Sequence, residues 1–184
     1  MDSLSGYCSA SNRLIIICGL SFAGKSVLAE AICSRFKYLQ VDVNEVKTGL
    51  FGVDVRDEDL SKKQWDLVYG EADNMIVNYL QLDAGVVDAS RHFRKAERSR
   101  IKRIAHGIGV KTITVHVNTP EAEARRRWME NRVNPTRRDI AGKHFEEIVK
   151  AMEPPDANED AIVFHWEDDI GDWLSKHADI LAGG

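Results

Sequence analysis

The fold of this chain is predicted most strongly by residues 12–28, NRLIIICGLSFAGKSVL. Within it, GLSFAGKS at residues 19–26 fits the pattern G-x-x-x-x-G-K-[ST] of a phosphate-binding loop. The preceding run LIIIC, residues 14–18, is continuously apolar, as a parallel strand buried on both faces requires. After the loop, apolar residues recur at helical spacing as far as Phe36. A strand, a glycine-rich loop and a helix in this order are the context in which the pattern binds phosphate.

Each part of this loop has a separate task in holding a triphosphate. Glycine lets the backbone turn so that successive N–H groups point into one concavity. Lys25 can extend to the β- and γ-phosphates, and the Ser26 hydroxyl can be a ligand of magnesium. The helix that begins near Gly24 adds its positive N-terminal end. We therefore expect ATP and Mg²⁺ as cofactors, with nucleotide contacts from Gly19, Ser21, Phe22, Ala23, Gly24, Lys25, Ser26 and Val27.

The composition predicts one domain in a reducing compartment. The chain has 184 residues, enough for a full core, and a net charge of −4, which argues against a broadly basic surface for nucleic acid. Its three cysteines show no metal-binding spacing, so we read Cys18 and Cys33 as buried small hydrophobes. No apolar stretch has membrane-spanning length, and the first residues do not resemble a signal peptide. We expect a cytoplasmic protein with a flexible N-terminus over residues 1–11 and a single domain over residues 12–184.

Strands and helices alternate along the chain. Helical patterns begin near residue 24 and cover about 63–82, 94–106, 119–132, 141–152 and 170–181, and residues 49–62 read as a loop. Thr119 and Pro120 begin the fourth of these helices well, as a cap and a first-turn residue. The expected strands are residues 14–18, 38–43, 85–88, 111–117 and 161–166. This order predicts an α/β three-layer P-loop NTPase fold, with a five-stranded parallel sheet covered by helices on both faces.

Carboxylates follow the second and third strands, and strand ends meet at one crevice in such a sheet. We expect Asp88 to hold magnesium or its water shell; the alternative is that it caps the next helix. A kinase needs a carboxylate to take the proton of the acceptor hydroxyl. Asp42 is the first candidate and Glu45 the second, the alternative being acids of a solvated loop. Lys47 is either a ligand of an anionic substrate group or a lone surface lysine.

Arginines gather between two predicted helices. Residues 127–140 suit a small lid that brings arginines over the γ-phosphate, where they stabilise the transition state; the alternative is a basic helix end. The basic run of residues 91–103 reads as a solvated helix face, so nucleic acid is possible as a partner but not favoured. Among Arg125, Arg126, Arg127, Arg132, Arg137 and Arg138, we expect function chiefly in Arg127, Arg132 and Arg138.

Taken together, these residues resemble the P-loop kinases of the AAA_33 type, relatives of polynucleotide 5′-kinase, chloramphenicol phosphotransferase, gluconate kinase and zeta-toxin kinases. The resemblance implies an ATP- and magnesium-dependent phosphotransferase, with Asp42 at the acceptor pocket and lid arginines on the triphosphate. Polynucleotide-kinase-like members carry an aspartate and an arginine where this chain has Asn44 and Lys47, and an amide cannot act as a base. The landmarks are residues 19–26, Asp42, Asn44-Glu45, 49–52, Trp65, 86–88, Arg98, 117–120, Arg127, Asn131-Arg132, Arg138-Asp139, 153–155 and Glu159.

The sequence thus favours a kinase that moves the γ-phosphate of ATP to a hydroxyl of a small molecule. A polynucleotide 5′-hydroxyl kinase is one alternative, and a regulatory ATPase without an organic acceptor is another. We expect a monomer or weak dimer. The acceptor and the preference between ATP and GTP do not follow from the sequence.

Overall fold

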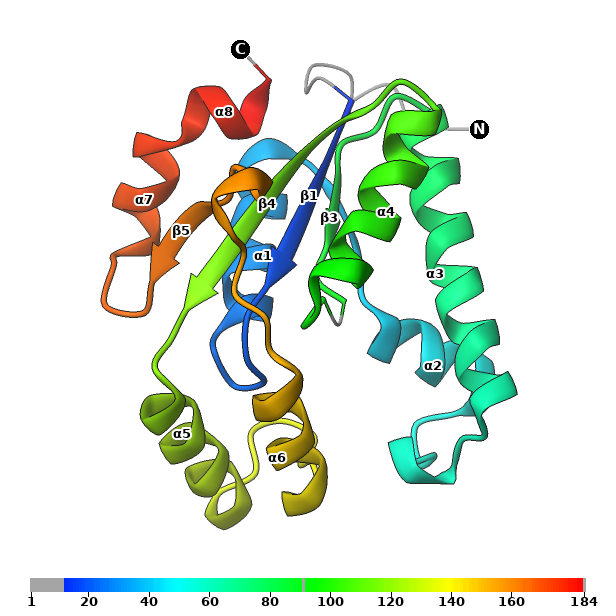
Figure 1. Ribbon diagram of the computed structural model, residues 1–184, viewed down its shortest axis with the longest axis vertical. Coiled ribbons are helices and arrows are strands. Elements are labelled where there is room, and N and C mark those ends of the chain that lie inside the picture. Colours follow the sequence, from blue (N-terminus) through cyan, green and yellow to red (C-terminus); the bar gives the residue numbers. More distant parts are fainter. Residues whose placement is uncertain (1–11, 91, 184) are drawn as a thin grey trace.

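The computed structural model describes residues 12–90 and 92–183, and its centre is a parallel sheet (Figure 1). The strands lie in the order β2-β3-β1-β4-β5, and every neighbouring pair is parallel. This confirms the predicted five-stranded sheet, although three of its strands, β2, β3 and β5, are shorter than expected. The strands are β1 Arg13–Cys18, β2 Leu39–Val41, β3 Val86–Asp88, β4 Lys111–Asn118 and β5 Ile162–His165.

Helices cover both faces of the sheet, as predicted. Side chains alternate along β1, so Ile15 and Ile17 pack in one apolar cluster with α1, α7 and α8. Leu14 and Ile16 face the opposite way, into a second cluster with α2, α3 and α4. The helices are α1 Lys25–Phe36, α2 Val43–Phe51, α3 Lys62–Gln81, α4 Lys95–Gly107, α5 Glu121–Val133, α6 Gly142–Ala151, α7 Ile170–Lys176 and α8 Ala178–Ala182, with short 3-10 turns η1 Asp57–Asp59 and η2 Ala157–Glu159.

Helix α2 departs from the predicted strand end and loop. β2 ends at Val41, and Asp42 caps α2, its Oδ1 accepting a hydrogen bond from the Asn44 N–H at 2.8 Å. Val43 and Val46 pack into the second apolar cluster, and this burial offsets the weak helical pattern. The predicted closing helix is likewise two helices, α7 and α8, which meet at His177.

Two further expectations are wrong because tertiary contacts decide them. Thr119 does not cap α5; Pro120 is the N-cap residue, and the Thr119 hydroxyl instead donates to the Ala23 carbonyl at 2.8 Å. Lys47 is not a surface lysine, because it is completely buried and pairs with Asp57 at 2.6 Å. That ion pair ties α2 to η1.

Cys18 is buried and Cys33 half-buried, and burial raises the pKa of each thiol to about 11. Cys8 and the predicted flexible N-terminus lie outside the described residues.

None of the described helices is both long and apolar enough to cross a bilayer.

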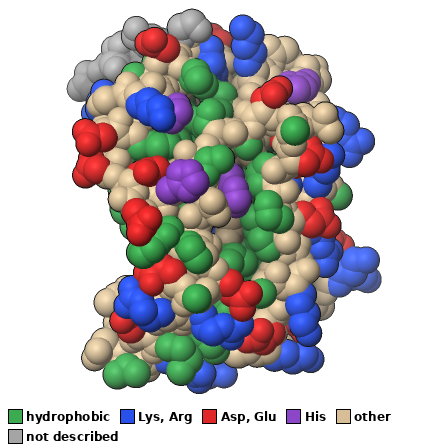
Figure 2. All heavy atoms as spheres, turned by 60° about the vertical axis from the view of Figure 1, so that its left-hand side comes forward, with side chains coloured by type: hydrophobic (Ala, Val, Ile, Leu, Met, Phe, Trp, Pro, Cys, Tyr) green, Lys and Arg blue, Asp and Glu red, His purple; other side chains and the backbone are tan. Residues whose placement is uncertain are grey.

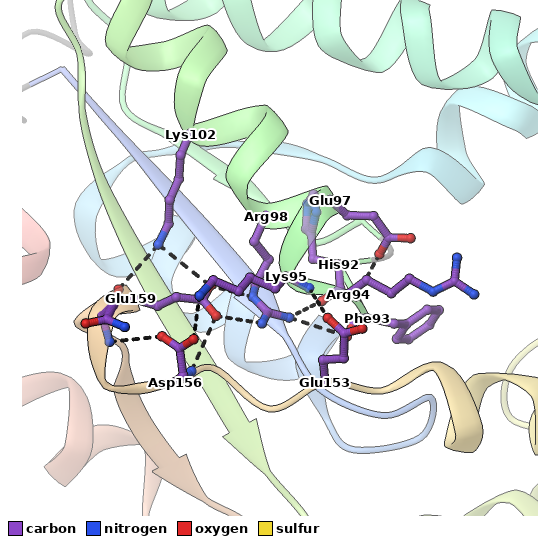
Figure 3. Close-up of polar contacts among 11 residues, drawn as sticks. His92, Phe93, Arg94, Lys95, Glu97, Arg98, Lys102, Glu153, Asp156 and Glu159 are labelled. Atoms are coloured by element: carbon purple, nitrogen blue, oxygen red, sulfur yellow. Dashed lines mark hydrogen bonds and ion pairs between the residues drawn. The ribbon is translucent and has the colours of Figure 1, made fainter.

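Helix α4 is not simply a solvated basic face, because Arg98 is fully buried. Figure 3 shows the polar contacts of this arginine. Its Nε and Nη2 donate to the two carboxylate oxygens of Glu159, each at 2.7 Å. Its Nη1 donates to the carbonyls of His92 and Phe93 at 3.1 and 3.4 Å. Lys95, also on α4, forms a further ion pair with Asp156 at 2.5 Å. These ion pairs hold the segment after α6 against α4. Arg98 also holds the backbone of His92 and Phe93, in the loop before α4.

Glu159→Gln is expected to destabilise the fold by about 3–5 kcal/mol at neutral pH, because Arg98 would be left as an uncompensated buried charge. The hydrogen bond from Arg98 lowers the pKa of Glu159, which outweighs the opposing effect of burial. This stabilisation is present above the ordinary glutamate pKa and is lost as the pH falls through the lowered one. Denaturant unfolding of both proteins as a function of pH measures the difference. A variant as stable as the parent at neutral pH, like the exposed control Glu167→Gln, would contradict the assignment.

Candidate active site

The loop between β1 and α1 has the backbone that phosphate binding requires. Gly19 has φ +146°, and a Cβ there would lie 2.6 Å from the Val117 carbonyl oxygen of β4. Phe22 has φ +63° and Gly24 φ +105° directly before α1. Such a turn into a helix N-terminus gathers N–H groups into a concavity suited to an anion. The loop therefore has a shape that fits the phosphates of a nucleotide.

Lys25, the first residue of α1, lies along this loop. Its Nζ donates to the carbonyls of Gly19 and Leu20 at 2.9 and 2.8 Å. The ammonium also lies 5.5 Å from the centre of the Phe93 ring, which belongs to the loop before α4. Ser26 follows in the first turn of α1 and is half-buried, whereas Val27 is exposed.

Asp88 ends β3 and lies in a buried hydrogen-bond network. Its Oδ2 is 2.7 Å from Nε2 of His92, and its Oδ1 accepts from the Ser90 N–H at 3.0 Å. Burial opposes ionisation, but the charge and hydrogen bond of His92, with the hydrogen bonds from Ser90, hold the pKa of Asp88 below its ordinary value. Asp88 does not cap the next helix, whose N-cap residue is Arg94. That alternative is therefore wrong, and Asp88 is a buried carboxylate at the carboxyl end of β3.

The sheet order brings the predicted crevice residues together. β3 lies between β2 and β1, and Val41 is the register partner of Asp88. The Val43 N–H donates to the Ser90 hydroxyl oxygen at 3.2 Å, which joins the ends of β2 and β3. Asp42 follows Val41 directly, and Glu45 is exposed one turn further along α2. The ends of β2 and β3 are therefore side by side, next to the strand that leads into the phosphate-binding loop.

A cavity of about 410 Å³ opens beside Asp88, between α3 and α4. Its charged lining was only partly predicted, because the contacts join segments far apart in sequence. One signal is visible in the sequence: residues 66, 69 and 73 share a helical face of α3 that carries polar side chains. Lining residues with polar groups are Asp66, Tyr69, Asp73, Asp88, Ser90, His92, Glu97 and Arg100; Val43, Ala72 and Ile76 supply apolar surface.

Of the three arginines favoured from the sequence, Arg127 reaches the phosphate-binding loop. Its Nε donates to Glu123 at 2.7 Å, and its Nη1 donates to the Ala23 carbonyl at 3.3 Å. Arg132 instead pairs with Asp139 at 3.4 Å, and Arg138 donates to the Val55 carbonyl in the segment before η1.

Arg137, which was not favoured, lies with its guanidinium 4.5 Å from the centre of the Phe22 ring. Phe22, Trp128 and Phe145 form a buried cluster, in which the rings of Trp128 and Phe145 stack with their centres 4.7 Å apart. α5 and α6 therefore pack as a pair against the phosphate-binding loop (Figure 1). Arg138 extends from the turn between them toward the other side of the site.

Charges of both signs are interleaved on the face that contains α5 (Figure 2). Arg125 pairs with Glu121 and Glu146 at 2.7 and 2.5 Å. Arg126 pairs with Glu123 at 2.7 Å and also with Glu130. This part of the surface is not a continuous basic patch of the kind that binds nucleic acid.

Residues 14–155 match the model of the AAA_33 family, described as an AAA domain. The chain belongs to this family. No curated protein is significantly similar to this AAA_33 chain in sequence. Several solved structures share its fold at low sequence identity, and the fold is that of P-loop NTPases.

Three of these structures match nearly the whole AAA_33 chain. Kti12 from Chaetomium thermophilum, in complex with ADP-AlF3, has a TM-score of 0.72 at 18% identity, over 92% of this chain and 100% of that one. A sugar kinase from Janibacter sp. has a TM-score of 0.64 at 13% identity, over 93% and 95%. A gluconokinase from Sinorhizobium meliloti has a TM-score of 0.61 at 16% identity, over 95% and 94%.

Proposed function

We propose that this protein transfers the γ-phosphate of ATP to a hydroxyl group of a small molecule bound in the cavity between α3 and α4. The observation that carries the proposal is the placement of this cavity. It is lined by Asp88 at the end of β3, and β3 is the direct neighbour of the strand that leads into the phosphate-binding loop. The likeness in fold to a sugar kinase and a gluconokinase supports the same conclusion.

The nucleotide's phosphates would be held by the loop backbone and by Lys25. Lys25 exchanges its contacts with loop carbonyls for phosphate oxygens, and its charge offsets theirs. The residues fit a magnesium ion, because an ionised carboxylate and a hydroxyl are oxygen ligands and Mg²⁺ keeps several waters. Ser26 would be a direct ligand, and Asp88 would hold the ion or its water shell. When bound, magnesium neutralises charge on the transferring phosphoryl group.

A carboxylate beside the acceptor has to receive the hydroxyl proton. Asp42 is the proposed base, because it follows β2 directly. It therefore lies where the ends of β2 and β3 are in contact. Glu45, exposed on α2, is the second candidate.

The lid would consist of residues 127–140, with Arg127 acting from its base. Arg127→Met is expected to lower kcat/KM for ATP by about 100-fold, because an arginine at the phosphates stabilises charge in the transition state. Arg126→Met is the matched control, because Arg126 is the preceding residue and pairs with Glu123 and Glu130 on the outer side of α5. Steady-state kinetics with both variants measures the effect. Equal losses in the two variants would contradict a specific role for Arg127, and Arg132 and Arg138 would then be tested in the same way.

The proposed function predicts that ADP formation depends on an organic acceptor. ADP release is measured with Mg²⁺ and ATP, with and without sugars, amino sugars, nucleosides and a 5′-hydroxyl oligonucleotide. Stimulation by one small acceptor supports the proposal. Stimulation by the oligonucleotide alone, falling steeply with salt, would identify a polynucleotide kinase instead. ADP release that no acceptor changes would identify an ATPase.

A further inference from the structure

The charge of the cavity between α3 and α4 limits what it can bind. Among the described residues that line it, four carboxylates (Asp66, Asp73, Asp88 and Glu97) face one guanidinium, that of Arg100. Among the described lining residues, carboxylates therefore outnumber guanidinium groups by three, or by two when Asp88 is counted with the magnesium ion instead. A concave surface with one sign of charge focuses its field on the ligand, so this lining disfavours an anion.

The guanidinium of Arg100, which is the one among the described lining residues, is already paired with a carboxylate. Both terminal nitrogens of Arg100 donate to the carboxylate of Asp73, and Nη2 lies 3.1 Å from Oδ1. The pairing raises the pKa of Arg100. It also occupies the two N–H groups through which an arginine side chain binds a carboxylate or a phosphate. A phosphate or carboxylate on the acceptor would have to displace Asp73 to gain this partner.

A second observation indicates a polar ligand at this place. His92 lines the cavity, its side chain is 5% exposed, and its Nε2 is held by Asp88. Its buried Nδ1 has no hydrogen-bond partner among the described residues. A buried ring nitrogen without a partner is costly, and a hydroxyl group of a ligand would supply one, because a hydroxyl can both donate and accept a hydrogen bond.

The rest of the lining suits a small ligand with a carbon ring. Val43, Ala72 and Ile76 supply apolar surface, and Tyr69 supplies an aromatic ring. A volume of about 410 Å³ lies in the range of pockets that enclose small organic ligands. The cavity therefore combines carboxylates that accept hydrogen bonds with surface for C–H groups.

We infer that the acceptor is a hydroxyl compound that also carries an ammonium group, such as an amino sugar or a cyclic amino alcohol, and that phosphorylated and carboxylated acceptors are excluded. This inference rests on the proposed function, in which the cavity holds the acceptor. Asp66, exposed at the cavity on α3, is the carboxylate best placed to select a cation without holding the fold together.

The test compares three probes of equal size: glucosamine, glucose and glucuronate, together with their disaccharides. Binding is measured by titration calorimetry at physiological salt with a non-hydrolysable ATP analogue present, for the parent protein, Asp66→Lys and Glu71→Lys. Glu71 is the matched control, because it is exposed on the same helix and does not line the cavity. At this salt, charges more than about 8 Å apart are largely screened, so the control reports on general charge effects.

We expect the amino compounds to bind most tightly and the uronates most weakly. Asp66→Lys should weaken binding of the amino compounds by about 10-fold or more and leave that of the neutral compounds nearly unchanged, and Glu71→Lys should change neither. Uronates that bind as tightly as amino compounds, an Asp66→Lys variant without effect, or no binding by any probe would overturn the inference.

Phosphate transfer separates this inference from the proposed function. Selective binding of amino compounds without transfer of phosphate would support the inferred ligand class and remove the kinase assignment. Transfer to uronates in preference to amino compounds would support a kinase and overturn the inferred acceptor.

Discussion

Lys25→Ala is expected to lower phosphoryl transfer by about a thousandfold or more. Without the Lys25 ammonium, the β- and γ-phosphates lose the positive charge that lies along the phosphate-binding loop. The transition state spreads charge over the transferring oxygens, so this loss falls mainly on kcat.

Lys63→Ala is the control for this substitution, because Lys63 is an exposed lysine of α3. Transfer of label from γ-labelled ATP is measured for both variants, and thermal unfolding checks that each is folded. A folded Lys25→Ala protein with the parent's transfer rate would show that the phosphate-binding loop is not where the chemistry occurs.

Asp42→Asn is expected to lower transfer by about 100-fold to 10,000-fold while ATP affinity changes little. Asparagine is as good an N-cap residue as aspartate, so α2 should be retained and the loss should report on proton transfer. Kinetics of transfer and direct titration with ATP distinguish the two effects.

Glu45→Gln tests the alternative base in the same helix. If Asp42→Asn transfers phosphate normally and Glu45→Gln does not, the base is Glu45. A joint loss of ATP binding and transfer in Asp42→Asn would instead indicate a role in holding the nucleotide or its metal ion.

The fold follows from local signals that are strong in this sequence. The run Leu14–Cys18 is buried on both faces, and the adjoining loop requires positive φ at Gly19 and Gly24. Alternation of such units with amphipathic helices allows few topologies other than a parallel sheet. The placement of Asp42 and Asp88 at the ends of neighbouring strands follows from that topology together with the strand order.

The site is less predictable where it depends on pairs of residues far apart in the chain. Arg98 reads as one of many basic residues on α4, and its buried partner Glu159 comes 61 residues later. Arg100 and Asp73 are 27 residues apart, on helices that pack only in the folded state. Lys47 is buried because η1 presents Asp57 to it. Local periodicity contains no information on such pairs, so the acidic cavity and its neutralised arginine emerge only from the structure.

The fate of the γ-phosphate distinguishes a phosphotransferase from an ATPase. The protein is incubated with Mg²⁺, γ-labelled ATP and a hydroxyl acceptor such as glucosamine, and the labelled products are separated and identified by mass spectrometry. We predict label in an organic phosphate ester, formed in equal amount with ADP and absent with Lys25→Ala. Label found only as inorganic phosphate, at a rate that no acceptor on the panel changes, would contradict the assignment as a phosphotransferase.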